Sequence, residues 1–172
     1  MRPYLIALLL TVSCLLTACG LKLRSAQALP ETFSHVSVIS TRAHAPMQRM
    51  LERRLPVYQL QSIDPELDSS VQLNPQAIVS LRLQPEQLER RLLSVFSSGQ
   101  VAEYELLFKV EYSVSFPDKP VIDTSVLVTR EYQDDPDEVL AKSRELEIVL
   151  AEMRFEAADR MIRMLSSQHA GL

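Results

Sequence analysis

The middle of the chain alternates between apolar and polar side chains. Every second residue from Tyr104 to Phe116 is apolar, and the residues between them are charged or polar with the single exception of Leu107. A period of two residues is typical of a β-strand that has one buried face and one wet face. The stretch therefore predicts a long strand that requires an apolar layer against one of its faces.

The segments around this stretch predict further strands. Thr124–Tyr132 follows turn residues 117–120 and places Val126 and Val128 on one side with Tyr132. Residues 77–83 predict a strand with apolar side chains on both faces, and residues 35–40 predict the first strand. Residues 57–63 are only a weak candidate for an extended segment.

Residues 88–96 allow two interpretations. Their apolar residues fit a helix that begins at Pro85 almost as well as a bent or bulged strand, and the period alone favours the helix. The next residues, Ser97-Ser98-Gly99-Gln100, contain the only glycine away from the chain ends. A lone glycine between two apolar runs is typical of a tight hairpin turn with positive φ.

Two segments have the period of an α-helix. The first begins at Pro46, carries an apolar stripe from Met47 to Leu55 and stops at Pro56. The second begins at Asp135-Pro136-Asp137-Glu138, where Asp135 would cap the helix and Pro136 would be its first residue. Its stripe comprises Val139, Leu146, Val149, Leu150, Met153, Ala157, Met161, Met164 and Leu165. These elements predict an α+β, two-layer sandwich of two helices on a roughly four-stranded mixed sheet.

The start of the chain predicts a lipoprotein leader. Arg2 precedes an apolar run too short to span a bilayer, and Leu16-Thr17-Ala18 leads into Cys19 as at bacterial lipoprotein cleavage sites. Cys14 is a poorer candidate, because the apolar run would shrink to about nine residues. We expect residues 1–18 to be removed and Cys19 to carry N-acyl and S-diacylglycerol groups that anchor the protein. Gly20, in place of aspartate, favours the outer membrane.

Cleavage after Ala18 would leave 154 of the 172 residues, enough for one domain. We expect a tether over residues 19–34, a single domain over 35–166 and a C-terminal tail over 167–172. The mature chain would have 17 basic and 22 acidic side chains, so nucleic acid is not an expected partner.

The sequence lacks the patterns of an enzyme. His35, His44 and His169 do not have the spacing of metal ligands, and neither a phosphate-binding loop nor a nucleophile motif is present. We therefore expect no catalytic residues, no metal and no cofactor other than the lipid on Cys19. The methionines of the last helix could line a lipid groove, but their helical spacing favours core packing.

Three pieces of sequence together resemble the LptE family of lipopolysaccharide-assembly lipoproteins. They are Cys19-Gly20 followed by residues 21–24, the run Ser94–Tyr104, and the pairs Ala141-Lys142 and Glu152-Met153. The Gly-Gln-x-Ala-Glu-Tyr stretch at residues 99–104 is the most specific of them. The resemblance implies two helices on a four-stranded sheet and favours a strand over residues 88–96.

The resemblance also implies a function. Proteins of this family plug the β-barrel of LptD, with which a 1:1 complex is expected, assist its assembly and bind lipopolysaccharide on its way to the cell surface. Of the basic positions credited with lipopolysaccharide contact, Lys142 matches one, while Ser97 occupies the other and leaves Arg90 or Arg91 as possible substitutes. The turn residues Ser97, Ser98, Gly99 and Gln100 are expected to contact the partner.

Two alternatives remain open from the sequence. Lys142 could instead pair with Glu138, four residues earlier on the predicted helix. The whole chain could instead be a lipid-carrier lipoprotein of an ABC-type or bridge transport system, holding phospholipid in a groove under the long helix.

Overall fold

The computed structural model describes residues 29, 33–42, 45–64 and 77–171. The predicted leader, Cys19, His44 and most of the predicted tether lie outside the described residues. Among the described residues the strands are β1 (His35–Ser40), β2 (Gln61–Ile63), β3 (Ile78–Leu83), β4 (Gln87–Val95), β5 (Val101–Ser115) and β6 (Ile122–Gln133). The helices are α2 (Pro46–Arg54), a 3₁₀ segment (Leu55–Tyr58) and α3 (Val139–Ala170).

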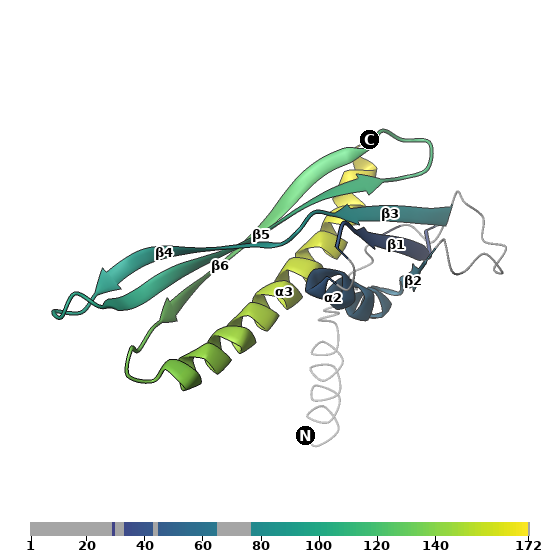
Figure 1. The fold of residues 1–172 in the computed structure, drawn as a ribbon. Coiled ribbons are helices and arrows are strands. Elements are labelled where there is room, and N and C mark those ends of the chain that lie inside the picture. The colour runs from purple at the N-terminus through teal and green to yellow at the C-terminus, as the bar shows by residue number, and fades with distance from the viewer. Residues whose placement is uncertain (1–28, 30–32, 43–44, 65–76, 172) are drawn as a thin grey trace, which may run out of the picture.

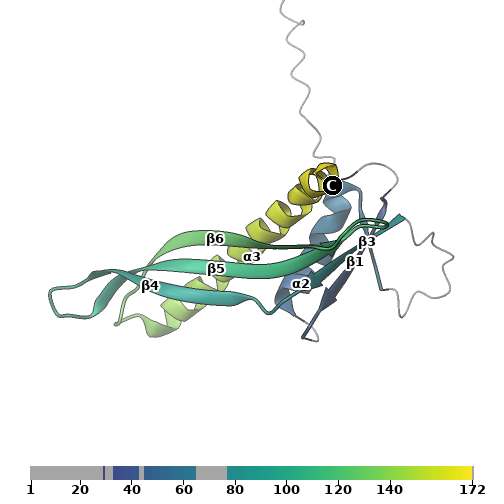
Figure 2. The same ribbon diagram turned by 90° about the horizontal axis from the view of Figure 1, so that it is seen from above.

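The six strands form one mixed sheet, and both helices lie on the same face of it (Figures 1 and 2). The strand order is β2-β1-β3-β5-β4, with β6 paired to the other side of β5. β1 is parallel to β2 and β3, whereas β5 is antiparallel to β3, β4 and β6. The predicted α+β two-layer class is confirmed, and the predicted strand number is too low.

β5 is the centre of the sheet, as its alternating sequence predicts. It pairs with β6 along most of its length and with β4 and then β3 along its other side. Its apolar side chains from Leu106 to Val114 are buried against the helices, together with Phe116. The core that they form with α2 and α3 includes Leu51 of α2 and Met161 of α3, both fully buried.

Residues 88–95 lie in β4 and not in a helix, and Phe96 follows the strand. The strand pairs with β5 from Gln87–Lys109 to Leu92–Tyr104, and its register is irregular between Leu92 and Val95. This irregularity breaks the two-residue alternation, which explains why the apolar residues fit a helical period. The preference for a helix from periodicity was therefore wrong, and the strand implied by the family resemblance is confirmed.

The long helix begins later than its sequence predicts. Asp135 does not cap it: its Oδ1 accepts a hydrogen bond from the Asp137 backbone N–H at 2.9 Å, within the turn that precedes the helix. Glu138 is the N-cap residue without a side-chain capping bond, and Val139 is exposed. The helix continues to Ala170, four residues into the segment predicted as a tail.

One further local expectation is confirmed and another differs from the structure. The α-helix ends at Arg54, before Pro56 as predicted, and the chain continues as a 3₁₀ turn over Leu55–Tyr58. β3 is buried on one face only: Val79 and Leu81 are in the core, whereas Arg82 is exposed. The difference at β3 arises because both helices cover the same side of the sheet.

Two bidentate ion pairs hold α3 in place. Arg154 of α3 donates to both carboxylate oxygens of Glu86, between β3 and β4, at 2.6–3.1 Å. Arg54 of α2 donates to both oxygens of Asp159 at 2.8 and 3.1 Å. Planar guanidinium groups match carboxylates in this geometry, so these pairs fix the helix along its axis.

Candidate functional site

Lys142 lies in the first turn of α3, where the last residues of β6 pass close to the helix. Its Nζ donates to Glu145 Oε2 at 2.9 Å and lies 5.5 Å from the centroid of the Tyr132 ring. The alternative of a side-chain pair with Glu138 is wrong, because Glu138 contributes only its carbonyl, which accepts the Lys142 backbone N–H. Lys142 is thus held between an aromatic ring and a carboxylate.

Tyr132 connects β6 to this turn of the helix. Its hydroxyl donates to the carbonyl oxygen of Lys142 at 2.7 Å, and its side chain is buried in the core. Burial raises the pKa of the Tyr132 hydroxyl, and the charge of Glu145 raises it further. The hydroxyl therefore remains a neutral donor, and it anchors the backbone of the residue that carries the cation.

Arg90 of β4 lies on the same face of the sheet as Tyr132. It pairs with Leu106 in the register of β4 and β5, and Leu106 is buried under the helices, so Arg90 projects from the helix-covered face. Its charge acts with that of Lys142 to lower the pKa of Tyr132, against the larger effects of burial and Glu145. Among the described residues Arg90 makes no ion pair. Arg90 and Tyr132 thus share one face of the sheet, on the two strands that flank β5.

Arg91 is not part of this cluster. Its side chain lies on the opposite face of the sheet, where it pairs with Glu105 at 3.1 Å and with Glu89 at 3.9 Å. Adjacent residues of a strand point to opposite faces, so Arg90 and Arg91 cannot serve one site together.

The turn at Ser97–Gln100 closes the hairpin of β4 and β5, which extends past the start of α3 (Figure 1). Gly99 has a φ of +83°, as predicted, and its N–H donates to the Phe96 carbonyl at 2.9 Å. All four turn residues are exposed. Four apolar side chains beside the turn are also 45–54% exposed, namely Leu92, Leu93, Val95 and Phe96. The hairpin therefore presents an apolar surface that the sequence analysis did not anticipate.

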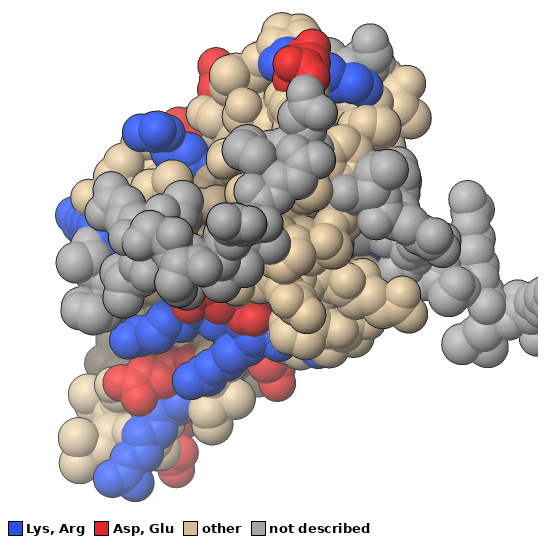
Figure 3. Space-filling model, turned by 90° about the vertical axis from the view of Figure 1, so that its right-hand side faces the viewer, with Lys and Arg blue, Asp and Glu red and all other residues tan. Residues whose placement is uncertain are grey.

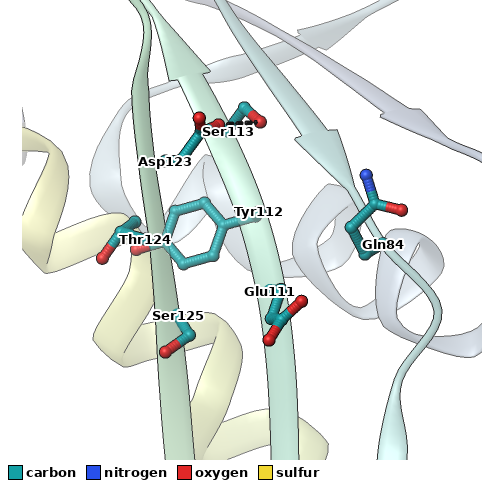
Figure 4. Close-up of a pocket in the computed structure, with 7 residues that line it drawn as sticks. All are labelled: Gln84, Glu111, Tyr112, Ser113, Asp123, Thr124 and Ser125. Carbon is teal, nitrogen blue, oxygen red and sulfur yellow. Dashed lines mark hydrogen bonds between the residues drawn. The ribbon is translucent and has the colours of Figure 1, made fainter.

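The helix-free face of the sheet has a different character. A hollow of about 570 Å³ lies there among Gln84, Glu111, Ser113, Asp123 and Ser125 (Figure 4). Both carboxylates already have partners: Ser113 donates to Asp123 at 2.6 Å, and Lys109 pairs with Glu111. The residues that line this hollow include carboxylates and no Lys or Arg, so its lining does not favour an anionic ligand.

Figure 3 views the molecule from the end that carries β1, β2 and α2. Among the described residues, basic and acidic side chains are interleaved over the lower part of this view. Within the described ranges, no three His, Cys, Asp or Glu side chains come together as metal ligands would, and no described helix is long and apolar enough to cross a membrane. The cluster of Lys142, Arg90 and Tyr132 is thus the best candidate for an anion site.

Sequence reasoning missed two members of this cluster. Glu145 could have been found from the sequence, because it lies three residues after Lys142 and therefore on the same face of the predicted helix. Tyr132 had none, since its contact with Lys142 depends on how β6 turns into α3.

Comparison with known proteins gives a consistent result. The family model LptE, described as "Lipopolysaccharide-assembly", matches residues 31–165. The chain is 31% identical to the LPS-assembly lipoprotein LptE of Pectobacterium atrosepticum over 96% of this chain and 86% of that protein. It is also 31% identical to LptE of Photorhabdus laumondii, over 98% of this chain and 89% of the relative.

Solved structures share the fold. The rare lipoprotein B of Shewanella oneidensis has a TM-score of 0.67 and 34% identity, covering 80% of this chain and 97% of that one. Lipoprotein B of Nitrosomonas europaea has a TM-score of 0.65 at 22% identity, covering 88% and 93% of the two chains, which supports the fold alone.

Proposed function

This chain belongs to the LptE family of lipopolysaccharide-assembly lipoproteins, and on that premise we propose that it binds lipopolysaccharide through Lys142 and Arg90 while it plugs the β-barrel of LptD. The observation that carries the first part is that two cations lie on the helix-covered side of the sheet, Lys142 of α3 beside the Tyr132 ring and Arg90 on β4. Lipid A, the membrane end of lipopolysaccharide, carries phosphate groups. Arginine and lysine are the side chains that bind phosphate, the former as a fork and the latter as a point charge.

The surroundings of the two cations suit an amphiphilic ligand. Leu92 lies two residues after Arg90 on the same face of β4 and is half exposed, and Leu146 lies one turn after Lys142. A phosphate held by Lys142 and Arg90 would thus have apolar side chains beside it, where acyl chains could pack.

The role as a barrel plug is supported by the two exposed surfaces. The helix-free face of the sheet carries the charged and hydroxyl side chains of β5 and β6, which suit a water-lined lumen. The hairpin with its exposed turn, Ser97–Gln100, and its apolar flanks offers a contact of the kind that loops make with partners. Acyl chains on Cys19 would hold the protein at the periplasmic side of the outer membrane.

The competing lipid-carrier hypothesis has less support. It requires a lipid groove under the long helix, but Met153, Ala157 and Met161 are fully buried there and pack into the core. Core packing of the methionines was the interpretation favoured from their spacing.

Titration with lipid A tests the binding proposal. We expect Lys142→Asp to weaken lipid A binding, Lys142→Arg to retain it, and the wild-type affinity to fall as salt rises from 50 to 300 mM, because exposed charges are screened within about 10 Å at 0.1 M. Arg91→Gln is the control, since it removes a cation from β4 next to Arg90 but from the other face of the sheet. Equal loss in Arg91→Gln and Lys142→Asp, or no loss in either, would contradict the proposed site.

A further inference from the structure

We propose that Glu145 competes with the anionic ligand for Lys142. The Glu145 carboxylate must release the Lys142 ammonium group before a lipid phosphate can bind it. This inference rests on the proposed function, because it assigns a role to a neighbour of the proposed lipopolysaccharide site. Glu145 would then lower the affinity of the site for every anion that needs Lys142, and it would keep Lys142 in place while the site is empty.

The side chains of Lys142 and Glu145 differ in how freely they can move into solvent. The Lys142 side chain is only 19% exposed and lies over the Tyr132 ring, whereas the Glu145 side chain is 50% exposed. The carboxylate can therefore swing into water without disturbing the core, while the ammonium group stays where it is. A carboxylate oxygen at 2.9 Å from Nζ occupies the position that a phosphate oxygen would take.

The start of α3 explains why such a partner is present. A cation in the first helical turn lies near the positive end of the helix dipole, which disfavours it. The hydrogen bond and charge of Glu145 offset this and raise the pKa of Lys142, with a smaller contribution from Asp135. Lys142 therefore remains charged and oriented, but the Glu145 carboxylate occupies it.

Arg90 has no corresponding competitor among the described residues. A phosphate can therefore bind Arg90 without displacing an internal anion, whereas it must displace Glu145 to bind Lys142. A phosphate monoester carries up to two charges, whereas a carboxylate carries one. We therefore expect the site to favour lipid phosphates over fatty-acid carboxylates, which compete with Glu145 on equal terms.

The test is the lipid A affinity of Glu145→Gln, with Glu147→Gln as the control. Glu147 is exposed on the same helix and has no ion pair in the described part of the chain, so its substitution makes the same change in net charge. We expect Glu145→Gln to bind lipid A about two- to fivefold more tightly than wild type, the range that corresponds to a surface ion pair, and Glu147→Gln to show no such gain. In a Lys142→Met background the gain from Glu145→Gln should vanish.

Further measurements distinguish a failure of the proposed site from a failure of the role proposed for Glu145. Laurate should also bind Glu145→Gln better than wild type, by about the same factor as lipid A, because both ligands must displace the same carboxylate from Lys142. If Lys142→Met leaves lipid A binding unchanged, the proposed site is wrong and this inference falls with it. If Lys142→Met weakens binding but Glu145→Gln and Glu147→Gln behave alike, the site stands and only the role of Glu145 is refuted. Circular dichroism confirms that each variant is folded.

Discussion

At the scale of single residues, the candidate site depends on a tyrosine that no functional motif includes. Tyr132 supplies the ring beside the Lys142 ammonium and the hydroxyl that holds the Lys142 carbonyl. One side chain thus sets both the position of the helix start and the direction of the cation.

Removal of the Tyr132 hydroxyl should lower the stability of the fold by a measurable amount. We expect Tyr132→Phe to lower the free energy of unfolding by about 0.5–1.5 kcal/mol, because the Lys142 carbonyl loses its donor while the ring remains. Urea denaturation measures the difference. Tyr104→Phe is the control, since the Tyr104 hydroxyl has no hydrogen bond within the described residues. Equal losses in both variants would show that the hydroxyl bond does not stabilise the fold.

The hairpin turn depends on Gly99 for a different reason. Nothing lies within 4 Å of a Cβ added there, so only the backbone conformation, with φ of +83°, opposes a side chain. Gly99→Val should cost about 1–3 kcal/mol of local strain and distort the turn with secondary structure retained. Less barrel partner should then co-purify than with the neighbouring control Ser98→Val. Equal recovery would mean that the turn is not a contact.

At the scale of elements, a charged cluster joins β6 to α3. Glu156 of α3 accepts hydrogen bonds from Arg130 of β6 and from Arg160, whose guanidinium also donates to the Leu127 carbonyl at 2.8 Å. Burial raises the pKa of the Glu156 carboxyl, but the hydrogen bonds and charges of Arg130 and Arg160 outweigh burial and lower the pKa below its ordinary value. The cluster therefore stabilises the ionised form.

The lowered pKa of Glu156 determines how the stability of the fold depends on pH. A carboxyl group whose pKa is lower in the folded state contributes stability above its unfolded value, here 4.5, and the contribution is lost as the pH falls through the folded value. Glu156→Gln should be less stable than wild type at pH 7, and the difference should shrink by pH 3.5. Urea denaturation at both pH values checks this, with Glu152→Gln as an exposed control on the same helix. A difference that stays constant with pH would contradict the assignment.

The elements also show what the sequence could predict. β5 was predictable because the alternation from Tyr104 to Phe116, which only Leu107 interrupts, allows only one register, and Gly99 because a reversal required positive φ. The sequence could not predict β4 or the start of α3. A register irregularity gives β4 the apolar spacing of a helix, and Asp135, which the sequence predicts as a helix cap, accepts its hydrogen bond in the turn before the helix. At the site, Lys142 and Arg90 were named from family resemblance. That Arg90 lies on the helix-covered face while Arg91 does not depends on the β4–β5 register, which only the fold fixes.

At the scale of the whole molecule, anchor and fold should be separable. We expect Cys19→Ala to lose fatty-acid labelling and to become soluble, while it stays folded and binds lipid A. Phe108→Asp should fail to fold, because Phe108 is 1% exposed at the centre of the core and a buried, unpaired charge is strongly destabilising. Labelling with a fatty-acid analogue, together with circular dichroism, tests both. An unlabelled wild type, or a Cys19→Ala protein that does not fold, would contradict this separation.

The most direct test of the central claim is the mass of the complex that the full-length protein forms in its own membrane. The protein would be tagged at its C-terminus, extracted from envelopes in mild detergent and weighed by native mass spectrometry. Our account predicts a 1:1 complex with a large outer-membrane β-barrel, retained in Cys19→Ala and lost in Phe108→Asp. A protein that emerges alone with bound phospholipid would contradict the account and favour a lipid carrier.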